Sequence, residues 1–258
     1  MQNTMPQLII FDKDGVILDL QATWLPVARA VAAHTVTLIP SIGDVTPEIT
    51  TVDLLHAIGV DDFSGHIDPK GIFATGSFAQ MLAKWQAMLP PQMIDLDHDE
   101  AYRNAVQSIV HEQTRQTTKA KGDVVTPLNA LHKAGYHLAL VTNDSESSAR
   151  QSLHDLGIAD LFCVIVGADS GFGSKPDPDG LLHCCDVAGV MPGASIMVGD
   201  TIADYGAAMA AGCKAFICIS DAFEFRPHDD IQPEFVIPDL TGLPGLLGVG
   251  PPKSEVAS

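Results

Sequence analysis

Two aspartates that stand two residues apart, Asp12 and Asp14, directly follow a short apolar run. Residues i and i+2 of an extended chain point to the same side, so the two carboxylates lie near each other. Such a pair suits two roles, an ionised nucleophile and a neighbour that gives and takes a proton. Gly15 permits the tight turn that frees both carboxylates from the strand. A pair of solvated loop aspartates is the open alternative, whereas an EF-hand loop is excluded because Gly15 follows Asp14 directly.

Two further aspartates, Asp200 and Asp204, stand four residues apart on one face of an expected helix start. Together with Asp12 they offer hard oxygen ligands to Mg2+, which prefers one or two carboxylates together with waters and substrate phosphate. A helix cap at Asp200 is the alternative, but a cap does not require Asp204. The sequence therefore predicts Mg2+ as a cofactor.

Three residues are candidates for binding a phosphate group. Thr142 offers a hydroxyl, and the backbone N–H groups that follow it, beginning at Asn143, open an expected helix, an arrangement that favours anions. Lys175 lies in a Gly/Pro-rich loop, where it can neutralise phosphate charge and pair with Asp12. The alternatives are a helix cap at Asn143 or Ser145 and a solvated surface lysine.

These residues follow short apolar runs that are bounded by turn residues and fit strands buried on both faces. The runs are Leu8–Phe11, His137–Thr142, Phe162–Gly167, Ser195–Val198, Ala215–Ile219 and Phe235–Ile237. Helix-like stretches that stop at a glycine accompany them: Val125–Ala134, Ser145–Leu156, Pro178–Ala188 and Ile202–Ala211. This alternation predicts an α/β fold with a doubly wound parallel sheet, at whose carboxyl edge the candidate side chains converge.

Between the first and second runs the patterns are helical. They cover Ala22–Leu38, Pro47–Ile58, Ser77–Leu89 and Asp99–Thr118, with a turn-rich stretch at Gly59–Gly76. We therefore expect an α/β catalytic core over residues 1–19 and 119–241 and an all-helical insertion over residues 20–118. Residues 242–258 are rich in Gly and Pro and are expected to form a poorly ordered tail.

The ordered set of motifs resembles the haloacid dehalogenase-like hydrolase superfamily and, within it, the phosphoglycolate phosphatase-like branch. The resemblance rests on Asp12-Lys13-Asp14-Gly15-Val16, Thr142, Lys175-Pro176-Asp177-Pro178 and Gly199-Asp200-Thr201 through Asp204. It covers nearly the whole chain, because the helical insertion lies where this family has its mobile cap. It implies a Rossmann-like core and a phosphatase acting on a small phosphorylated metabolite such as phosphoglycolate. Val16 stands where many members have Thr, and Lys13 fills a variable position whose direction the sequence does not determine.

The resemblance also implies roles for individual residues. Asp12 would form an aspartyl-phosphate, and Asp14 would protonate the leaving oxygen and then activate water. Thr142 would hold the transferring phosphoryl group, and Lys175 would steady both it and Asp12. The implied Mg2+ ligands are Asp12, the backbone carbonyl of Asp14, and Asp200, with Asp204 in support.

Four alternatives to a phosphatase arise within the same superfamily or fold. A dehalogenase needs neither a second aspartate nor Mg2+, so Asp14 argues against it. A phosphonate hydrolase would use a cap lysine as a Schiff base, and Leu20–Leu38 contains no lysine. A sugar phosphomutase of the β type shares all four motifs and differs in its cap, so it stays open. A non-catalytic phosphate-binding module predicts a broken catalytic set, whereas this set is complete.

The insertion would select the substrate, and three of its residues are candidates for that role. Lys70, in the turn-rich loop, could meet a substrate carboxylate, with a solvated loop lysine as the alternative. Trp24 and Arg29 are the other two candidates.

The composition restricts the partners and the compartment. There are 32 Asp and Glu residues against 14 Lys and Arg, a net charge of −18, and so acidic a surface repels nucleic acid and anionic membranes. No apolar stretch approaches the roughly 18 residues of a spanning helix, and no signal peptide is recognisable at the N-terminus. The five cysteines form no C-x-x-C pair, which indicates reduced thiols and a cytoplasmic protein.

Overall fold

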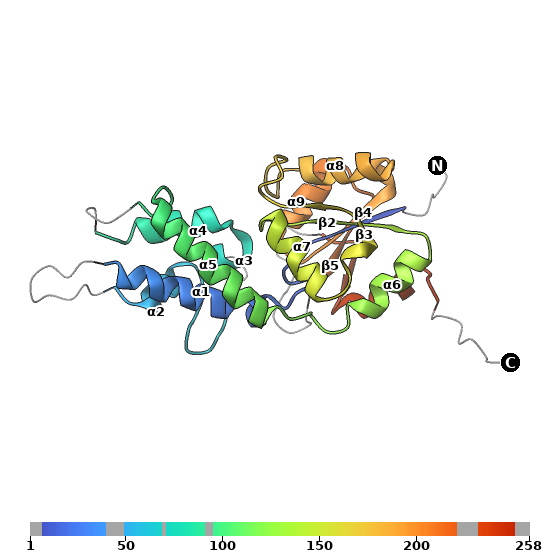
Figure 1. The fold of residues 1–258 in the computed structure, drawn as a ribbon. Helices are drawn as coiled ribbons and strands as arrows, with labels where there is room; N and C mark the ends of the chain where they lie inside the picture. The colour runs from blue at the N-terminus through green and yellow to red at the C-terminus, as the bar shows by residue number, and fades with distance from the viewer. Residues whose placement is uncertain (1–6, 40–48, 69–70, 91–94, 221–231, 251–258) are drawn as a thin grey trace, which may run out of the picture. The chain divides into compact units, whose positions relative to one another are not determined.

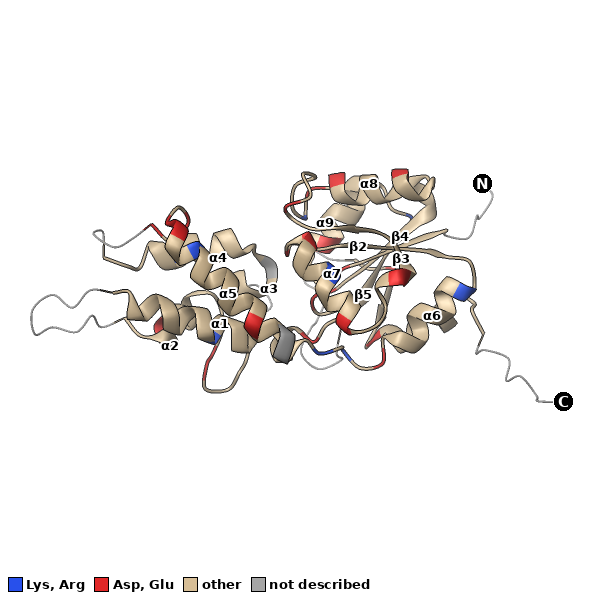
Figure 2. Ribbon diagram, in the orientation of Figure 1, with Lys and Arg blue, Asp and Glu red and all other residues tan. Residues whose placement is uncertain are grey.

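The chain divides into two compact units, one formed by Met1–Asp19 with Ala120–Ser258 and the other by Leu20–Lys119. The computed structural model describes residues 7–39, 49–68, 71–90, 95–220 and 232–250. Asp and Glu residues occur on helices of both units (Figure 2), in a chain whose net charge is −18.

The first unit contains a six-stranded sheet in the order β3-β2-β1-β4-β5-β6, and every neighbouring pair is parallel (Figure 1). The strands are β1 (Leu8–Phe11), β2 (His137–Val141), β3 (Phe162–Val166), β4 (Ser195–Gly199), β5 (Ala215–Ile219) and β6 (Phe235–Ile237). The predicted α/β fold with a doubly wound parallel sheet is confirmed. From β1 the sheet continues through β2 to β3 on one side, and from β4 it continues through β5 to β6 on the other. The direction in which successive strands are added therefore reverses between β1 and β4, and open α/β sheets bind ligands at such a point.

Helices cover both faces of the sheet (Figure 1). Ile9 and Phe11 of β1 face the core that contains α6 (Val125–Lys133) and α7 (Glu146–Asp155). Leu8 and Ile10 face the opposite core, with α8 (Asp179–Ala188) and α9 (Ile202–Ala211). Because successive side chains of a strand alternate between faces, β1 is apolar throughout and buried on both sides. The 3-10 turns η1 (Ala159–Leu161) and η2 (Pro192–Ala194) lead into β3 and β4.

The second unit is helical and has its own apolar core. Its helices are α1 (Leu20–Thr37), α2 (Thr51–Ala57), α3 (Ile72–Thr75), α4 (Phe78–Gln86) and α5 (Glu100–Thr117). Trp85 is fully buried in that core, and its indole N–H donates to the carbonyl of Leu54 at 2.8 Å. The Tyr102 hydroxyl lies 2.8 Å from Thr35 Oγ1, which joins α5 to α1. Among the described residues, no helix is both long enough and apolar enough to cross a membrane.

The prediction of a poorly ordered tail from residue 242 is wrong for residues 242–249. The 3-10 turn η3 (Leu240–Gly242) continues into α10 (Leu243–Leu246), and the side chains of Leu240 and Leu243 are fully buried in the core beneath α6. The burial of these two leucine side chains stabilises the segment, although its Gly and Pro content is typical of a loop. Residues 251–258 lie outside the described part of the chain.

Replacement of Leu243 by alanine should therefore lower the free energy of unfolding by about 2–5 kcal/mol, because it leaves a cavity in a packed core. Urea denaturation followed by circular dichroism measures the loss. Met191→Ala is the control, since this side chain is 77% exposed, and its effect should stay within about 0.5 kcal/mol. Equal effects of the two substitutions would contradict the packed C-terminal segment.

Candidate active site

The carboxyl ends of β1 and β4 place Asp12 beside the loop that carries Asp200. The two strands are in register at Phe11 and Val198, and the Asp12 N–H donates to the carbonyl of Val198 at 2.9 Å. Asp12 thus follows the last residue of one central strand, and Asp200 follows the last residue of its neighbour. The parallel sheet therefore brings together two carboxylates that are 188 positions apart in the sequence.

Lys175 forms the centre of a buried ion-pair network. Its Nζ lies 2.5 Å from Asp12 Oδ1 and 2.6 Å from Asp204 Oδ1. All three residues are buried, with Asp12 and Lys175 6% and 7% exposed and Asp204 fully buried. Burial by itself lowers the pKa of Lys175, but the two carboxylates outweigh burial and raise this pKa above its ordinary value. The ammonium therefore stays charged.

Asp204 is held by the start of α9. Thr201 and Asp204 form a capping box in which each side chain accepts from the other's backbone N–H. Asp204 Oδ2 accepts from the N–H groups of Asp200 and Thr201 at 3.2 and 3.0 Å and from the Thr201 hydroxyl at 2.6 Å. Because protein donors occupy both of its oxygens, Asp204 is suited to supporting the site rather than to binding a cation directly.

Asp200 differs from Asp204 because one of its oxygens has no protein partner. Oδ1 is buried and has no hydrogen-bond partner among the residues that the structure describes, although a buried polar atom without a partner costs free energy. Gly15, with φ +79°, passes so close that a Cβ at this position would overlap the Asp200 carboxylate. The chain thus leaves room beside Asp200 by having no side chain at residue 15.

The carboxylate cluster fits a divalent cation. One oxygen from each of Asp12, Asp200 and Asp204 lies within 4.8 Å of the others. Burial raises the pKa of Asp12 to about 7 and that of Asp200 well above its ordinary value, and the neighbouring carboxylates add to both effects. Lys175 offsets part of this negative charge. A hard cation would offset more and would give Asp200 Oδ1 the partner it lacks.

Thr142 and Asn143 follow β2, next to β1. Thr142 is buried, and its hydroxyl accepts from the Asp144 N–H at 3.1 Å. The Asn143 side chain donates to the Lys175 carbonyl at 3.1 Å and accepts from the Lys175 N–H at 2.8 Å. The Asn143 amide thus holds the loop of Lys175, and only its backbone N–H is left for the phosphate-binding role predicted from the sequence. Ser145, not Asn143, is the N-cap of α7.

Asp14 lies in a second ion-pair network at the same edge of the sheet. Its Oδ2 is 3.2 Å from Nζ of Lys13, whose side chain is fully buried, and the same Nζ is 2.5 Å from Asp144 Oδ2. The group of carboxylates that could hold a cation does not include the Asp14 side chain, so the metal-ligand role predicted for Asp14 is one for its backbone carbonyl. Lys13 and Asp144 are polar residues of the site that the sequence analysis did not assign. The lysine between two aspartates in the sequence was the feature that could have indicated this contact. The direction of the Lys13 side chain, however, depends on the turn that follows.

The structure places two of the three insertion candidates in the helical unit. Arg29 Nε donates to Asp62 Oδ1 at 2.5 Å, and a second guanidinium N–H donates to the Asp62 carbonyl at 2.9 Å. Trp24 is half-buried against the apolar core of that unit. Lys70 lies outside the described residues.

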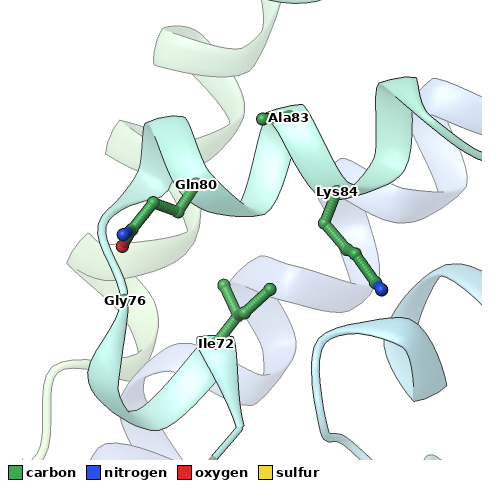
Figure 3. Close-up of a pocket in the computed structure, with 5 residues that line it drawn as sticks. All are labelled: Ile72, Gly76, Gln80, Ala83 and Lys84. Carbon is green, nitrogen blue, oxygen red and sulfur yellow. The ribbon is translucent and has the colours of Figure 1, made fainter.

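A hollow of about 420 Å³ also lies in the helical unit. Figure 3 shows Ile72 rising from α3 toward α4, from which Gln80 and Lys84 project. The remaining lining residues are Gly76 and Ala83. Lys84 is the charged residue among these five. The Gln80 side chain accepts from the Ser77 N–H in a capping box.

Gly15→Ala should remove most of the rise in melting temperature that Mg2+ produces, because a methyl group there overlaps the Asp200 carboxylate. Differential scanning fluorimetry with and without MgCl2 measures this rise. Gly157→Ala is the matched control. Gly157 also has a left-handed φ, +69°, but nothing lies within 4 Å of its Cβ, so it shares only the backbone cost of about 1–2 kcal/mol. An equal Mg2+ effect in both variants would contradict the assigned cluster.

Comparison with known proteins identifies the family of this chain. The model of the haloacid dehalogenase-like hydrolase family matches residues 6–212. The phosphoglycolate phosphatase of Thiobacillus denitrificans is 28% identical over 232 residues, covering 88% of this chain and 92% of that protein. The phosphoglycolate phosphatase of Pseudomonas putida is 29% identical, covering 98% of this chain and 83% of that protein.

Among solved structures, CbbY from Rhodobacter sphaeroides in complex with phosphate has the same fold. The TM-score is 0.66 at 17% identity, over 95% of this chain and 99% of that one. The family match runs from β1 through α9 and includes the four motifs at the carboxyl edge of the sheet. The chain belongs to the haloacid dehalogenase-like hydrolase family.

Proposed function

We propose that this hydrolase is a Mg2+-dependent phosphatase that acts on a small phosphorylated metabolite through an aspartyl-phosphate on Asp12. Family membership and the phosphoglycolate phosphatase relatives make it a hydrolase of phosphate monoesters. The observation that carries the proposal is the buried Asp12–Lys175–Asp204 network beside the unpartnered oxygen of Asp200. A purely structural ion pair would account for the burial of Lys175, but it would leave the buried Asp200 Oδ1 without a hydrogen-bond partner among the described residues.

In the first half of the reaction, a carboxylate oxygen of Asp12 attacks phosphorus. The bond between Asp12 and phosphorus forms as the bond to the leaving oxygen breaks, and the leaving oxygen takes the electron pair. The Asp14 carboxyl gives its proton to that oxygen, so the alcohol leaves neutral. Asp12 is buried at the end of β1, which limits the approach of water to the nucleophile.

In the second half, the Asp14 carboxylate takes a proton from water, whose oxygen attacks phosphorus. The bond between phosphorus and Asp12 breaks, which restores the Asp12 carboxylate and releases inorganic phosphate. Asp14 thereby regains the proton that it gave to the alcohol. One water and one phosphate ester are consumed, and one alcohol and one phosphate are released.

The remaining residues hold charge and position. Lys175 balances the negative charge of Asp12 and of the phosphoryl group, and Asn143 fixes the Lys175 backbone. The Thr142 hydroxyl holds a phosphoryl oxygen. Asp12, the Asp14 carbonyl and Asp200 would bind Mg2+, with Asp204 in support. When bound, the cation offsets the charge that accumulates on the phosphoryl oxygens.

The relatives favour phosphoglycolate as the substrate, and the helical unit would select it. Phosphoglycolate carries a carboxylate as well as a phosphate, so a cation of that unit would discriminate it from neutral phosphate esters. We propose that the enzyme acts in the cytoplasm, because all five cysteines are free thiols and three of them are buried.

Asp12→Asn should lower kcat for 4-nitrophenyl phosphate by at least ~1,000-fold while the circular dichroism spectrum stays unchanged, because an amide does not form the covalent intermediate. The matched control is Asp186→Asn, which makes the same change at an exposed position of α8 and should retain activity. Retained turnover in Asp12→Asn would remove Asp12 as the nucleophile.

Among phosphorylated metabolites, we expect the highest kcat/KM with phosphoglycolate. A panel that also contains glycerol 3-phosphate and glucose 1-phosphate, assayed for released phosphate, tests this preference. Conversion of β-glucose 1-phosphate to glucose 6-phosphate without phosphate release would instead indicate the sugar phosphomutase alternative.

A further inference from the structure

Lys13 is a fully buried lysine that touches the proposed acid–base residue. Its Nζ lies between two carboxylates, 2.5 Å from Asp144 Oδ2 and 3.2 Å from Asp14 Oδ2. Lys13 and Asp14 are on the turn after β1, whereas Asp144 follows β2. The lysine therefore links the ends of two neighbouring strands through the side chain of Asp14.

Asp144 is a rigid anchor for this lysine. Its Oδ1 accepts from the Ser145 N–H at 2.7 Å, and its carbonyl accepts from the Ala168 N–H at 2.8 Å. Its own N–H donates to the Thr142 hydroxyl at 3.1 Å. These bonds fix Asp144 to the start of α7, to the loop after β3 and to the residue that follows β2.

Packing alone does not explain a charged side chain at residue 13. Burying an ammonium costs several kcal/mol in desolvation, and an apolar side chain of similar volume often stabilises a core as well or better. The backbone already holds the turn, because the Lys13 carbonyl accepts from the N–H groups of Ile17 and Leu18 at 2.9 and 2.8 Å. What the ammonium adds is a fixed hydrogen-bond donor beside Asp14.

We propose that Lys13 is a positioning residue that, anchored by Asp144, orients the Asp14 carboxyl toward the leaving oxygen. The inference rests on the proposed function, in which Asp14 donates the proton to that oxygen. With Oδ2 of Asp14 held by Lys13, the rotation of the carboxyl is restricted. Without Lys13, Asp14 is still present but is oriented for proton transfer in fewer of its conformations.

The consequence is a specific dependence on the leaving group. An alkoxide is a poor leaving group and needs the proton of Asp14, whereas 4-nitrophenolate leaves readily without it. A misoriented Asp14 therefore slows alkyl phosphates more than 4-nitrophenyl phosphate. A purely structural role of Lys13 would slow all esters by the same factor.

The experiment compares kcat/KM for 4-nitrophenyl phosphate, phenyl phosphate and glycerol 3-phosphate in several variants. Lys13→Met removes the charge at similar length, and Asp144→Asn weakens the anchor but keeps the Oδ1 acceptor of the Ser145 N–H. Asp14→Asn gives the reference for a lost proton donor. Lys133→Met is the matched control, an exposed lysine at the end of α6, and should leave all three values unchanged.

In Lys13→Met we expect the loss with glycerol 3-phosphate to exceed the loss with 4-nitrophenyl phosphate by about tenfold, a fraction of the effect of a general acid. In Asp144→Asn the loss of kcat/KM with glycerol 3-phosphate should also exceed the loss with 4-nitrophenyl phosphate, by a smaller factor. This variant tests the positioning role if Lys13→Met does not fold. Parallel losses across the three esters would overturn the positioning role alone. Absence of hydrolysis of every ester by the unmodified enzyme would overturn the proposed function itself.

Discussion

The burial of two carboxylates, Asp12 and Asp204, against Lys175 is the constraint on which the rest of this edge of the sheet depends. Asp12 and Asp204 both contact Lys175, and their burial is tolerable only because charge and hydrogen bonds compensate for lost water. The capping box at Thr201 supplies donors to Asp204. Close packing also excludes side chains at two glycines, since a Cβ on residue 15 would overlap Asp200 and one on residue 199 would overlap Asp204. The capping box and the two glycines therefore all contribute to the arrangement of the aspartates around Lys175.

The parallel sheet makes this cluster possible, and the insertion leaves the sheet undisturbed. β1 lies between β2 and β4, so residues that follow these three strands meet at one edge, although Asp12 is more than 100 positions from both Thr142 and Asp200 in the sequence. The chain leaves the sheet-forming unit after Asp19 and returns at Ala120, where a bridge between Leu18 and Ala120 joins the two passages. The inserted helices bury Trp85 and Leu54 in a core of their own. A unit with its own core can vary without altering the carboxyl edge of the sheet.

Two lysines at this edge have different surroundings and suit different tasks. Lys175 lies against the carboxylate that would attack phosphorus and against Asp204, whose other oxygen accepts from the start of α9. Lys13 lies against Asp14 and Asp144, outside the carboxylate cluster. Burial lowers the pKa of Lys13, but Asp14 and Asp144 outweigh burial and raise the pKa above its ordinary value. In an acidic protein, these two buried ammonium groups offset part of the negative charge of the four carboxylates that they contact.

The sequence by itself determined the strands, their helical partners and the four motifs, because apolar runs, glycine stops and carboxylate spacing are local properties. β1, β5, β6 and α9 have the predicted bounds, and the fold class follows from their alternation. The packed segment at Leu243 was missed because Gly and Pro mask a short apolar pattern whose burial depends on the sheet. The direction of Lys13, the Asn143 contact with the Lys175 backbone and the orphaned Asp200 oxygen were decided only by the tertiary structure. Each depends on distances between strands that the chain connects through distant segments, and no local pattern encodes such distances.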